Sequence, residues 1–321
     1  MPPLPTLMNA PFFPQVSVIV PVYNGEEDLP ELLQGFRNQT YPNNRLEYLI
    51  VDNGSSDRTS EILQAADLPN LKPLSQTEIQ SSYAARNLGI KTAQYEILAF
   101  TDADCRPQPE WLANLVKPFA KPDIGLSVGE IIALPGNTLL EQHADRQETL
   151  SQKHTLANPF CPYGQTANLA VRRSIFDRVG LFRPYLTTGG DADICWRILR
   201  ETDWKYEFVP DATVKHRHRR TLKELQKQWY RYGKSNRYLH QLHGVDLMRS
   251  LTLKETLYRM TRWMVKEVPL TSAKMLLGKA DIVDLVKTPL GLYMFQARTQ
   301  GQTFSDLPEN ARYIEPLTPN S

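Results

Sequence analysis

Short apolar runs alternate with amphipathic segments over the first hundred residues. The runs are rich in β-branched and aromatic residues, which is typical of buried strands. They lie at 16–21 (VSVIVP), 46–51 (LEYLIV) and 95–101 (YEILAFT). Segments with helical spacing separate them, at 26–39, 57–66 and 80–93. This alternation predicts an α/β fold with a Rossmann-like, mostly parallel central sheet flanked by helices.

The pattern becomes less regular after residue 105, although further elements are recognisable. We expect a helix near 111–119, a strand near 124–133, a helical stretch near 138–153, a strand at 168–172, a helix from Asp191 and a last short strand at 206–209. Pro210 is expected to end that strand, because proline cannot donate to a strand ladder.

Basic helical segments follow Thr221. We expect helices from Thr221, over 253–268 and over 281–295, with Pro289 breaking the third, and a poorly ordered C-terminal tail. The expected organisation is an extended segment at 1–14, a catalytic domain at 15–220, a basic helical extension at 221–300 and a tail at 301–321.

Charge supports this division into an acidic and a basic part. Residues 1–211 carry 18 Lys and Arg against 26 Asp and Glu, whereas residues 212–321 carry 19 against 9. The 41% hydrophobic and 22% charged residues are ordinary for a globular protein. No window of 18 apolar residues predicts a membrane span, and the N-terminus lacks the basic region of a signal peptide.

Three cysteines, Cys105, Cys161 and Cys195, are an odd number at wide spacing without a C-x-x-C motif. They predict neither a disulfide framework nor a structural zinc site. A reducing, cytoplasmic location is therefore the expectation.

Polar clusters follow the three predicted N-terminal strands. They are Tyr23-Asn24-Gly25, the stretch from Asp52 to Asp57, and Asp102-Ala103-Asp104. Open α/β sheets bind ligands at the carboxyl ends of their strands, so we expect the clusters to meet at one crevice.

The acidic residues and one arginine of these clusters have two interpretations each. Asp102 and Asp104 could hold Mg²⁺ or Mn²⁺ together with phosphate, or they could simply order a turn. Asp52 could accept hydrogen bonds from a nucleobase or order its own turn. Arg86 could pair with Asp52 or a ligand anion, or form a surface salt bridge.

Two later segments also carry candidate chemistry. In Gly189-Gly190-Asp191-Ala192-Asp193 an ionised carboxylate at a helix start could be a general base, or both acids could only cap the helix. In KHRHRR, His216 could ligate a metal, or the segment could be a phosphate-binding or solvated basic patch.

Six ordered motifs together resemble the family 2 glycosyltransferases, which have the GT-A fold. The motifs are VSVIVPVYNGEEDL, YLIVDNGSSDRTSEI, AARNLGI, AFTDADC, NLAVRRSIFDRVGLF and GGDADICWRI, within about residues 16–220. The resemblance implies an inverting transfer from a nucleotide-sugar, with UDP favoured, to a hydroxyl acceptor by single displacement. A divalent metal, Mn²⁺ or Mg²⁺, would steady the diphosphate.

The resemblance also implies roles for individual residues. Asp191 would be the catalytic base, and Asp104 and His216 the metal ligands. The implied substrate-binding residues are Pro21, Tyr23, Glu26, Asp52, Arg86, Asp102, Asn168, Asp193 and Trp196.

Two departures from the family pattern narrow the expected acceptor. Gly190 stands where the family usually has Glu, so the acceptor could differ. The Q-x-x-R-W motif of processive synthases is absent, which favours a single transfer over a processive one. The resemblance implies that this transfer belongs to the synthesis of cell-envelope glycans. Amphipathic basic helices with Tyr258, Trp263 and Met264 could touch the cytoplasmic face of an anionic membrane, where lipid-linked acceptors lie, or could only cover the catalytic domain.

Other functions remain as alternatives. A catalytically silent nucleotide-sugar-binding scaffold would keep the same fold. A sugar nucleotidyltransferase would need a basic, Gly-rich loop near the N-terminus, where VPVYNGEEDL is acidic. Nucleic-acid binding is not expected, because the basic part has few interleaved aromatic residues.

Overall fold

The computed structural model describes residues 12–317, so most of the expected N-terminal segment 1–14 and the last residues of the tail lie outside it. Within this range one eight-stranded sheet has the order β3-β2-β1-β4-β7-β6-β8-β5. Its strands are β1 (Val16–Val22), β2 (Leu46–Asp52), β3 (Leu71–Ser75), β4 (Ile97–Thr101), β5 (Cys105–Pro107), β6 (Ile124–Ala133), β7 (Asn168–Arg172) and β8 (Lys205–His216).

The sheet confirms the α/β prediction and has two halves. The half β3-β2-β1-β4 is parallel, as the N-terminal alternation predicts. In the other half, β7 runs antiparallel to both β4 and β6, and β5 runs antiparallel to β8. The helices of the domain are α1 (Leu29–Arg37), α2 (Thr59–Ala65), α3 (Ser82–Thr92), α4 (Trp111–Leu115), α5 (Leu139–Arg146), α6 (Gln152–Leu156), α7 (Ile175–Val179) and α8 (Gly190–Glu201).

Both faces of the sheet are buried, which explains the continuous apolar runs of its central strands. Every residue of β1 is buried. On one face α1 inserts Leu29, Leu32 and Phe36 into a cluster that continues to Trp111 of α4. The opposite face is covered by α3, α7 and α8. Burial on both faces fixes the strand register and therefore the position of the loops at the strand ends.

β8 is longer than the sequence predicts. It continues through Pro210 to His216, whereas a stop at Val209 was expected. Its pairing with β6 shifts between Val209 and Thr213, where an irregularity accommodates the proline. A bulge lets the ladder resume beyond a residue that cannot donate a hydrogen bond. The strand therefore delivers His216 to the same sheet edge as β5.

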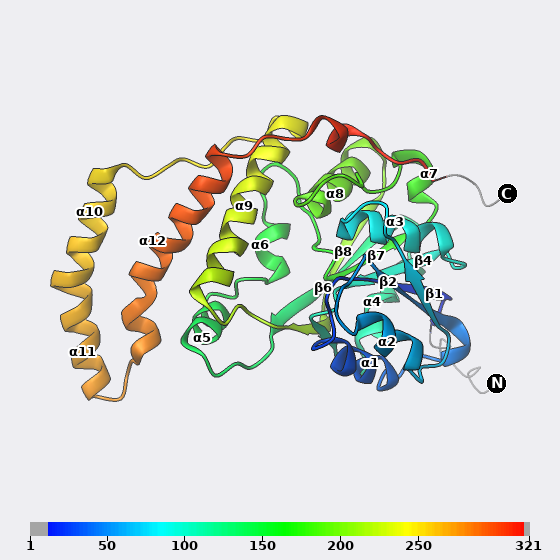
Figure 1. The fold of residues 1–321 in the computed structure, drawn as a ribbon, viewed down its shortest axis with the longest axis horizontal. Coiled ribbons are helices and arrows are strands. Elements are labelled where there is room, and N and C mark those ends of the chain that lie inside the picture. Colours follow the sequence, from blue (N-terminus) through cyan, green and yellow to red (C-terminus); the bar gives the residue numbers. More distant parts are fainter. Residues whose placement is uncertain (1–11, 318–321) are drawn as a thin grey trace, which may run out of the picture.

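The C-terminal part is a set of long helices beside the domain (Figure 1). They are α9 (Leu222–His243), α10 (Leu253–Arg262), a π-helical turn at Trp263–Glu267, α11 (Val268–Leu276) and α12 (Ile282–Thr303). α12 lies along α9, while α10 and α11 form the edge of the molecule farthest from the sheet.

Pro289 does not break α12, contrary to the sequence prediction. Its neighbour Leu290 is buried in a cluster with Leu140 of α5 and Leu225 of α9, and this packing holds both halves of the helix in line. Toward the C-terminal end, a Cβ on Gly301 would stand 1.9 Å from the Tyr230 carbonyl oxygen, so only glycine allows this approach of α9 and α12.

The expected poorly ordered tail is instead docked in its described part. Residues after α12 run over the end of α9 toward α7 (Figure 1). Ala311 and Leu317 are buried there, and Glu315 accepts a hydrogen bond of 2.7 Å from Asn87 Nδ2 on α3. Tertiary packing orders a segment whose local sequence has no strong preference.

Candidate functional site

The carboxyl ends of β1, β2 and β4 lie side by side, as predicted. Val22 pairs with Asp52, and Ile19 pairs with Phe100, which places Asp102 beside the end of β1. The loops after β1 and β2 are joined by hydrogen bonds, since Asn24 N donates to Ser55 Oγ at 2.8 Å. These strand ends therefore form one continuous rim.

Four predicted nucleotide-pocket residues lie on this rim. Pro21 is buried in β1, and Tyr23 is 53% exposed. Glu26 accepts a hydrogen bond of 3.2 Å from Arg58 N, and Asp52 accepts one of 3.0 Å from Ser55 N. Asp52 thus orders its own turn, and its side chain remains partly exposed.

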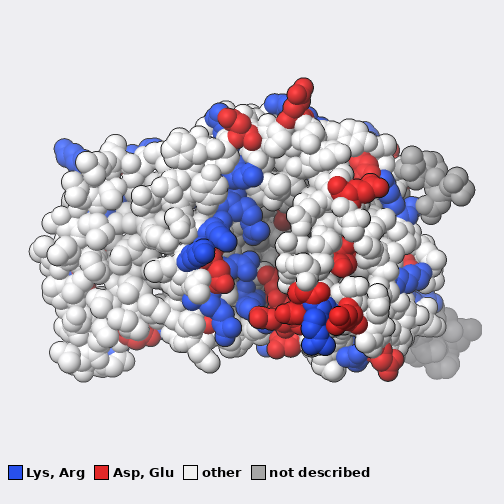
Figure 2. Space-filling view, viewed as in Figure 1, with Lys and Arg blue, Asp and Glu red and all other residues white. Residues whose placement is uncertain are grey.

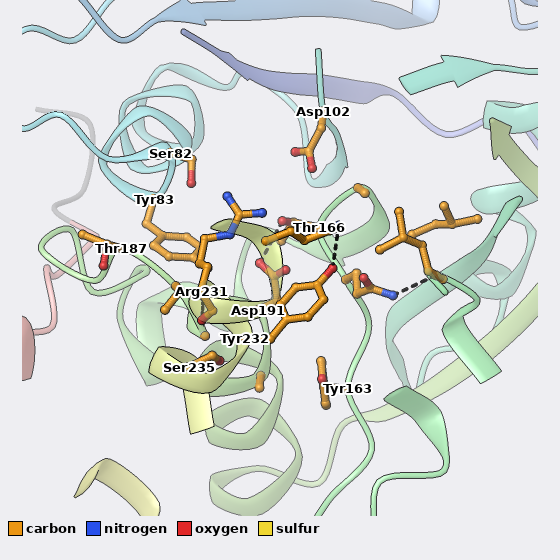
Figure 3. Close-up of a pocket in the computed structure, with 18 of the residues that line it drawn as sticks. Ser82, Tyr83, Asp102, Tyr163, Thr166, Thr187, Asp191, Arg231, Tyr232 and Ser235 are labelled. Carbon is orange, nitrogen blue, oxygen red and sulfur yellow. Dashed lines mark hydrogen bonds between the residues drawn. The ribbon is translucent and has the colours of Figure 1, made fainter. Parts of the chain in front are cut away.

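A cleft of about 220 Å³ lies between Asp102 at this rim, the start of α8 and the middle of α9. Figure 2 shows Lys and Arg side chains along the edge of a hollow that holds acidic side chains. Of the predicted site residues, Arg86, Asp102, Asp191 and His216 line the cleft. Figure 3 shows Asp191 near the middle of the cleft and Asp102 on the side of the sheet.

Asp191 is a half-buried acid of the cleft. It is the second residue of α8, which follows a loop that ends at Gly189 with a φ of +82°. Thr166 Oγ1 donates a hydrogen bond of 2.8 Å to Asp191 Oδ1. Burial raises the pKa of Asp191, Arg86 opposes the shift, and the nearby Asp102 adds to it. A carboxylate with a raised pKa takes up a proton more readily than an ordinary one.

Arg86 pairs with Asp102 and not with Asp52, the partner proposed from the sequence. Its Nη2 lies 2.5 Å from Asp102 Oδ1, and its side chain is only 4% exposed. The buried Nε of Arg86 has no hydrogen-bond partner among the described residues. The guanidinium therefore has a free donor close to the cleft.

Asp104 and His216 approach each other across β5 and β8. Asp104 Oδ1 lies 3.2 Å from His216 Nε2, and Arg219 Nη2 lies 3.8 Å from Asp104 Oδ2. Burial opposes ionisation of Asp104, but these two cations outweigh it and hold its pKa below the ordinary value. Burial likewise opposes the charge on His216, while Asp104 raises its pKa.

The donor atoms of Asp104, Cys105 and His216 all lie within 4.8 Å of one another, which fits a metal ion. The Cys105 thiol is a poor candidate ligand for a hard cation, because burial raises its pKa well above the usual value and sulfur is a soft donor. A carboxylate oxygen and an imidazole nitrogen remain, and this donor pair suits Mn²⁺ better than Ca²⁺.

Three predicted substrate-binding residues are buried and do not line the cleft. Asn168 is fully buried and bonds to Trp111, Glu130 and Ala212. Trp196 Nε1 donates to the Cys161 carbonyl at 2.8 Å.

Asp193 is the third residue, and it is also fully buried. Its carboxylate bonds to Arg183, Arg197 and His243. Because residues two apart on an α-helix lie on nearly opposite sides of it, Asp191 faces the cleft while Asp193 faces the core.

Several residues of the cleft were not predicted from the sequence. The cleft is also lined by Ser82, Tyr83, Tyr163, Gln165, Thr166, Thr187, Arg219, Gln228, Arg231, Tyr232 and Ser235. Of these, Arg219 belongs to the KHRHRR segment, for which a phosphate-binding patch was one of the predicted alternatives. The others come from the start of α3, from the loops before β7 and α8, and from α9, and no local pattern marks them.

Comparisons with known proteins identify the family of the chain. Residues 17–181 match the family model described as "Glycosyl transferase family 2". The chain is 35% identical over 245 residues to glycosyltransferase AglE of Haloferax volcanii, covering 75% of this chain and 79% of that one. It is 27% identical to a pre-mycofactocin glycosyltransferase of Mycobacterium tuberculosis, over 67% of this chain and 45% of that one.

Solved structures show the same fold. A mannosyltransferase from Pyrobaculum calidifontis, in complex with GDP-Man and Mn²⁺, aligns with a TM-score of 0.62 at 20% identity, covering 91% of this chain and 88% of that one. S. aureus TarS 1–349, in complex with UDP-GlcNAc, aligns with a TM-score of 0.52 at 16% identity, covering 90% of each chain. The fold is that of the GT-A glycosyltransferases, and the chain belongs to glycosyl transferase family 2.

Proposed function

We propose that this glycosyltransferase transfers a sugar with inversion from a UDP-linked donor to a hydroxyl of a saccharide or lipid-linked acceptor. The observation that carries the proposal is one cleft at the strand ends that brings together a half-buried acid, Asp191, an arginine–carboxylate pair and the neighbouring Asp104–His216 pair. The family membership supplies the reaction class.

Asp191 is the general base in this proposal. Its carboxylate takes the proton of the acceptor hydroxyl while that oxygen bonds to the anomeric carbon, on the face opposite to the departing diphosphate. A single displacement of this kind inverts the anomeric configuration. The Thr166 hydroxyl orients the carboxylate, and burial keeps its pKa raised toward the working range of a base.

The donor occupies the rim and the adjoining part of the cleft. We place the nucleotide against Pro21, Tyr23, Glu26 and Asp52, and the ribose near Asp102. The guanidinium groups of the cleft, from Arg86, Arg219 and Arg231, supply positive charge for the diphosphate.

Asp104 and His216 are the proposed ligands of a divalent ion, Mn²⁺ or Mg²⁺. A bound ion would offset the negative charge that develops on the departing diphosphate. The Mn²⁺ in the Pyrobaculum mannosyltransferase complex supports a metal in this fold. That complex holds GDP-Man and the TarS complex holds UDP-GlcNAc, so the choice of nucleotide needs a direct measurement.

Contact with an anionic membrane is part of the proposal. Within residues 12–317, none of the helices has the length and hydrophobicity to span a bilayer. Ten large apolar side chains are nevertheless exposed on or beside α10 and α11: Leu253, Leu257, Tyr258, Met264, Val265, Leu270, Met275, Leu276, Leu277 and Ile282. Figure 2 shows few charged side chains at this end of the molecule.

Basic residues accompany these apolar side chains. Between residues 252 and 280 the sequence has six cations, Lys254, Arg259, Arg262, Lys266, Lys274 and Lys279, against two acids. Apolar side chains with interspersed cations fit the cytoplasmic face of an anionic bilayer. We expect flotation with vesicles containing phosphatidylglycerol at low salt, and Leu257→Asp with Leu276→Asp to abolish it. Equal flotation of that variant, or none of the wild type, would contradict membrane contact.

Calorimetric titration tests the donor site. Wild-type protein is titrated with UDP and with GDP, each with and without Mn²⁺. We expect Mn²⁺-dependent binding of UDP that is lost in Asp104→Ala and kept in Asp123→Ala, an exposed acid paired with Lys205 away from the cleft. Preferential GDP binding would replace UDP in the proposal. Binding of neither nucleotide would favour a catalytically silent scaffold.

A further inference from the structure

A second cavity of about 500 Å³ opens beside the cleft, between α6 with its flanking loops and the helices α9 and α12. The two hollows adjoin each other, because they share five lining residues: Leu150, Tyr163, Gln165, Tyr232 and Ser235. A molecule whose reacting hydroxyl lies near Asp191 could therefore extend into this cavity, which we call the side groove.

The lining of the side groove has the chemistry of a saccharide site. Three aromatic side chains, Tyr163, Trp229 and Tyr232, offer flat apolar faces, and Trp229 and Tyr232 meet edge to face at 5.4 Å. Neutral polar groups such as Asn158 and Asn236 surround them. Sugar rings have apolar C–H faces and many hydroxyls, so aromatic faces with amide groups match them on both counts.

One residue that lines the side groove, Arg298, favours a negatively charged ligand. Arg298 of α12 borders the groove, whose lining contains no Asp or Glu among the described residues. Arg298 Nη2 donates to Asn236 Oδ1 at 3.2 Å, while its buried Nε has no partner, and no carboxylate of the described residues influences its charge. Burial lowers the pKa of Arg298, which shows that its charge is costly here without a counterion.

The indole N–H of Trp229 is a second unsatisfied donor at the same place. Trp229 Nε1 is buried without a hydrogen-bond partner, and the Arg298 guanidinium lies 6.0 Å from its ring centroid. Buried donors are normally satisfied, so two unpaired donors at one cavity indicate an acceptor-rich ligand.

Resting on the proposed function, we infer that the side groove binds the saccharide chain of the acceptor, and that this chain carries an anionic group, a carboxylate or a phosphate, which pairs with Arg298. The sugar residue that receives the new linkage lies in the cleft, and the residues before it lie against Trp229 and Tyr232. Arg298 and Trp229 are binding residues for the acceptor and take no part in donor binding.

Binding to a printed array of defined oligosaccharides tests this inference. The array holds neutral, uronate-containing and phosphate-containing chains of two to six residues. We expect acidic chains to bind to the wild type. Arg298→Gln should weaken the binding of acidic chains about tenfold or more and leave the binding of neutral chains unchanged. Arg298→Lys should restore part of the loss. Uronate and phosphate members distinguish the two sources of charge.

Trp229→Ala should weaken the binding of every oligosaccharide about tenfold, whereas Trp229→Phe should keep most of that affinity. Lys287→Gln is the matched control, because it removes a cation from the other end of α12. UDP and GDP titrations accompany each variant and should be unchanged. Intact nucleotide binding with no oligosaccharide bound, or acidic chains bound equally by Arg298→Gln, would overturn the inference. Loss of nucleotide binding in the wild type would overturn the proposed function itself.

Discussion

The hydroxyl of Tyr83 accepts a hydrogen bond of 2.9 Å from the backbone N–H of Gly190. A Cβ on residue 190 would stand 2.6 Å from the Tyr83 ring, so the ring occupies the space that a side chain there would need. Tyr83 also lies under the Arg86 guanidinium, 5.6 Å from the ring centroid. One aromatic residue of α3 thus supports both the start of α8 and the arginine that pairs with Asp102.

Gly190→Ala should therefore lower kcat/KM by about tenfold or more, because the displaced Tyr83 or α8 would shift Asp191. The fold should survive, as judged by thermal unfolding. In a double-mutant cycle, Tyr83→Ala combined with Gly190→Ala should cost less than the two single losses together, since the smaller side chain removes the clash. Strictly additive losses would show that Tyr83 and residue 190 do not interact in this way.

Thr166→Val should change the pH dependence of the reaction. The Thr166 hydroxyl bonds to the ionised form of Asp191 and so lowers a pKa that burial raises. Without this bond the pKa rises further. The base must be ionised, so the acid limb of kcat/KM should move to higher pH. Thr92→Val, a change at a partly exposed residue of α3, should leave the acid limb at the same pH. An acid limb that moves to lower pH in Thr166→Val would refute the assignment of Asp191 as the base.

Local patterns predicted the elements but not the contacts between distant segments. The central strands and the helices that follow them were predictable, because apolar periodicity reflects burial directly. The lengths of β8 and α12 were not, since Pro210 and Pro289 are tolerated by a bulge and by tertiary packing. The tail is ordered by contacts with α3, more than two hundred residues away in sequence.

In the candidate site, too, the sequence predicted positions at the ends of elements but not the contacts between distant segments. Asp191 and the rim residues Tyr23 and Asp52 lie where the strand and helix ends placed them. The sequence offered Asp52 or a ligand anion as the partner of Arg86, and the structure pairs it with Asp102, because sequence does not reveal which of two neighbouring loops a side chain reaches. Asn168 was assigned to substrate, although its amide satisfies three buried groups that lie far apart in the sequence.

Glu315 should anchor the docked segment. Its side chain accepts a bond from Asn87 and forms an ion pair with Lys91, both on α3. Glu315→Ala should lower the free energy of unfolding by about 1 kcal/mol, since it leaves the Asn87 amide with one partner fewer. Glu309→Ala, on the same segment, is the control in urea unfolding. Equal stability of the two variants would mean that the Glu315 contacts contribute nothing.

Asp193 should make stability, rather than catalysis, depend on pH. Its burial opposes ionisation, but His243, Arg197 and Arg183 outweigh this and lower its pKa from 3.8 to about 2. The stabilisation, about 2 kcal/mol, is complete above pH 3.8, the value in the unfolded chain, and disappears as pH falls toward 2.

Asp193→Asn should therefore unfold more easily at pH 7, by about 3 kcal/mol or more because buried cations lose their counterion. Between pH 4 and 2 its stability should fall less steeply than that of the wild type. The measurement is urea unfolding across this range, with the exposed Asp177→Asn as control. UDP or GDP affinity at pH 7 should not change, because Asp193 faces the core. A variant that unfolds like the wild type but loses nucleotide binding would instead support the prediction that Asp193 binds substrate.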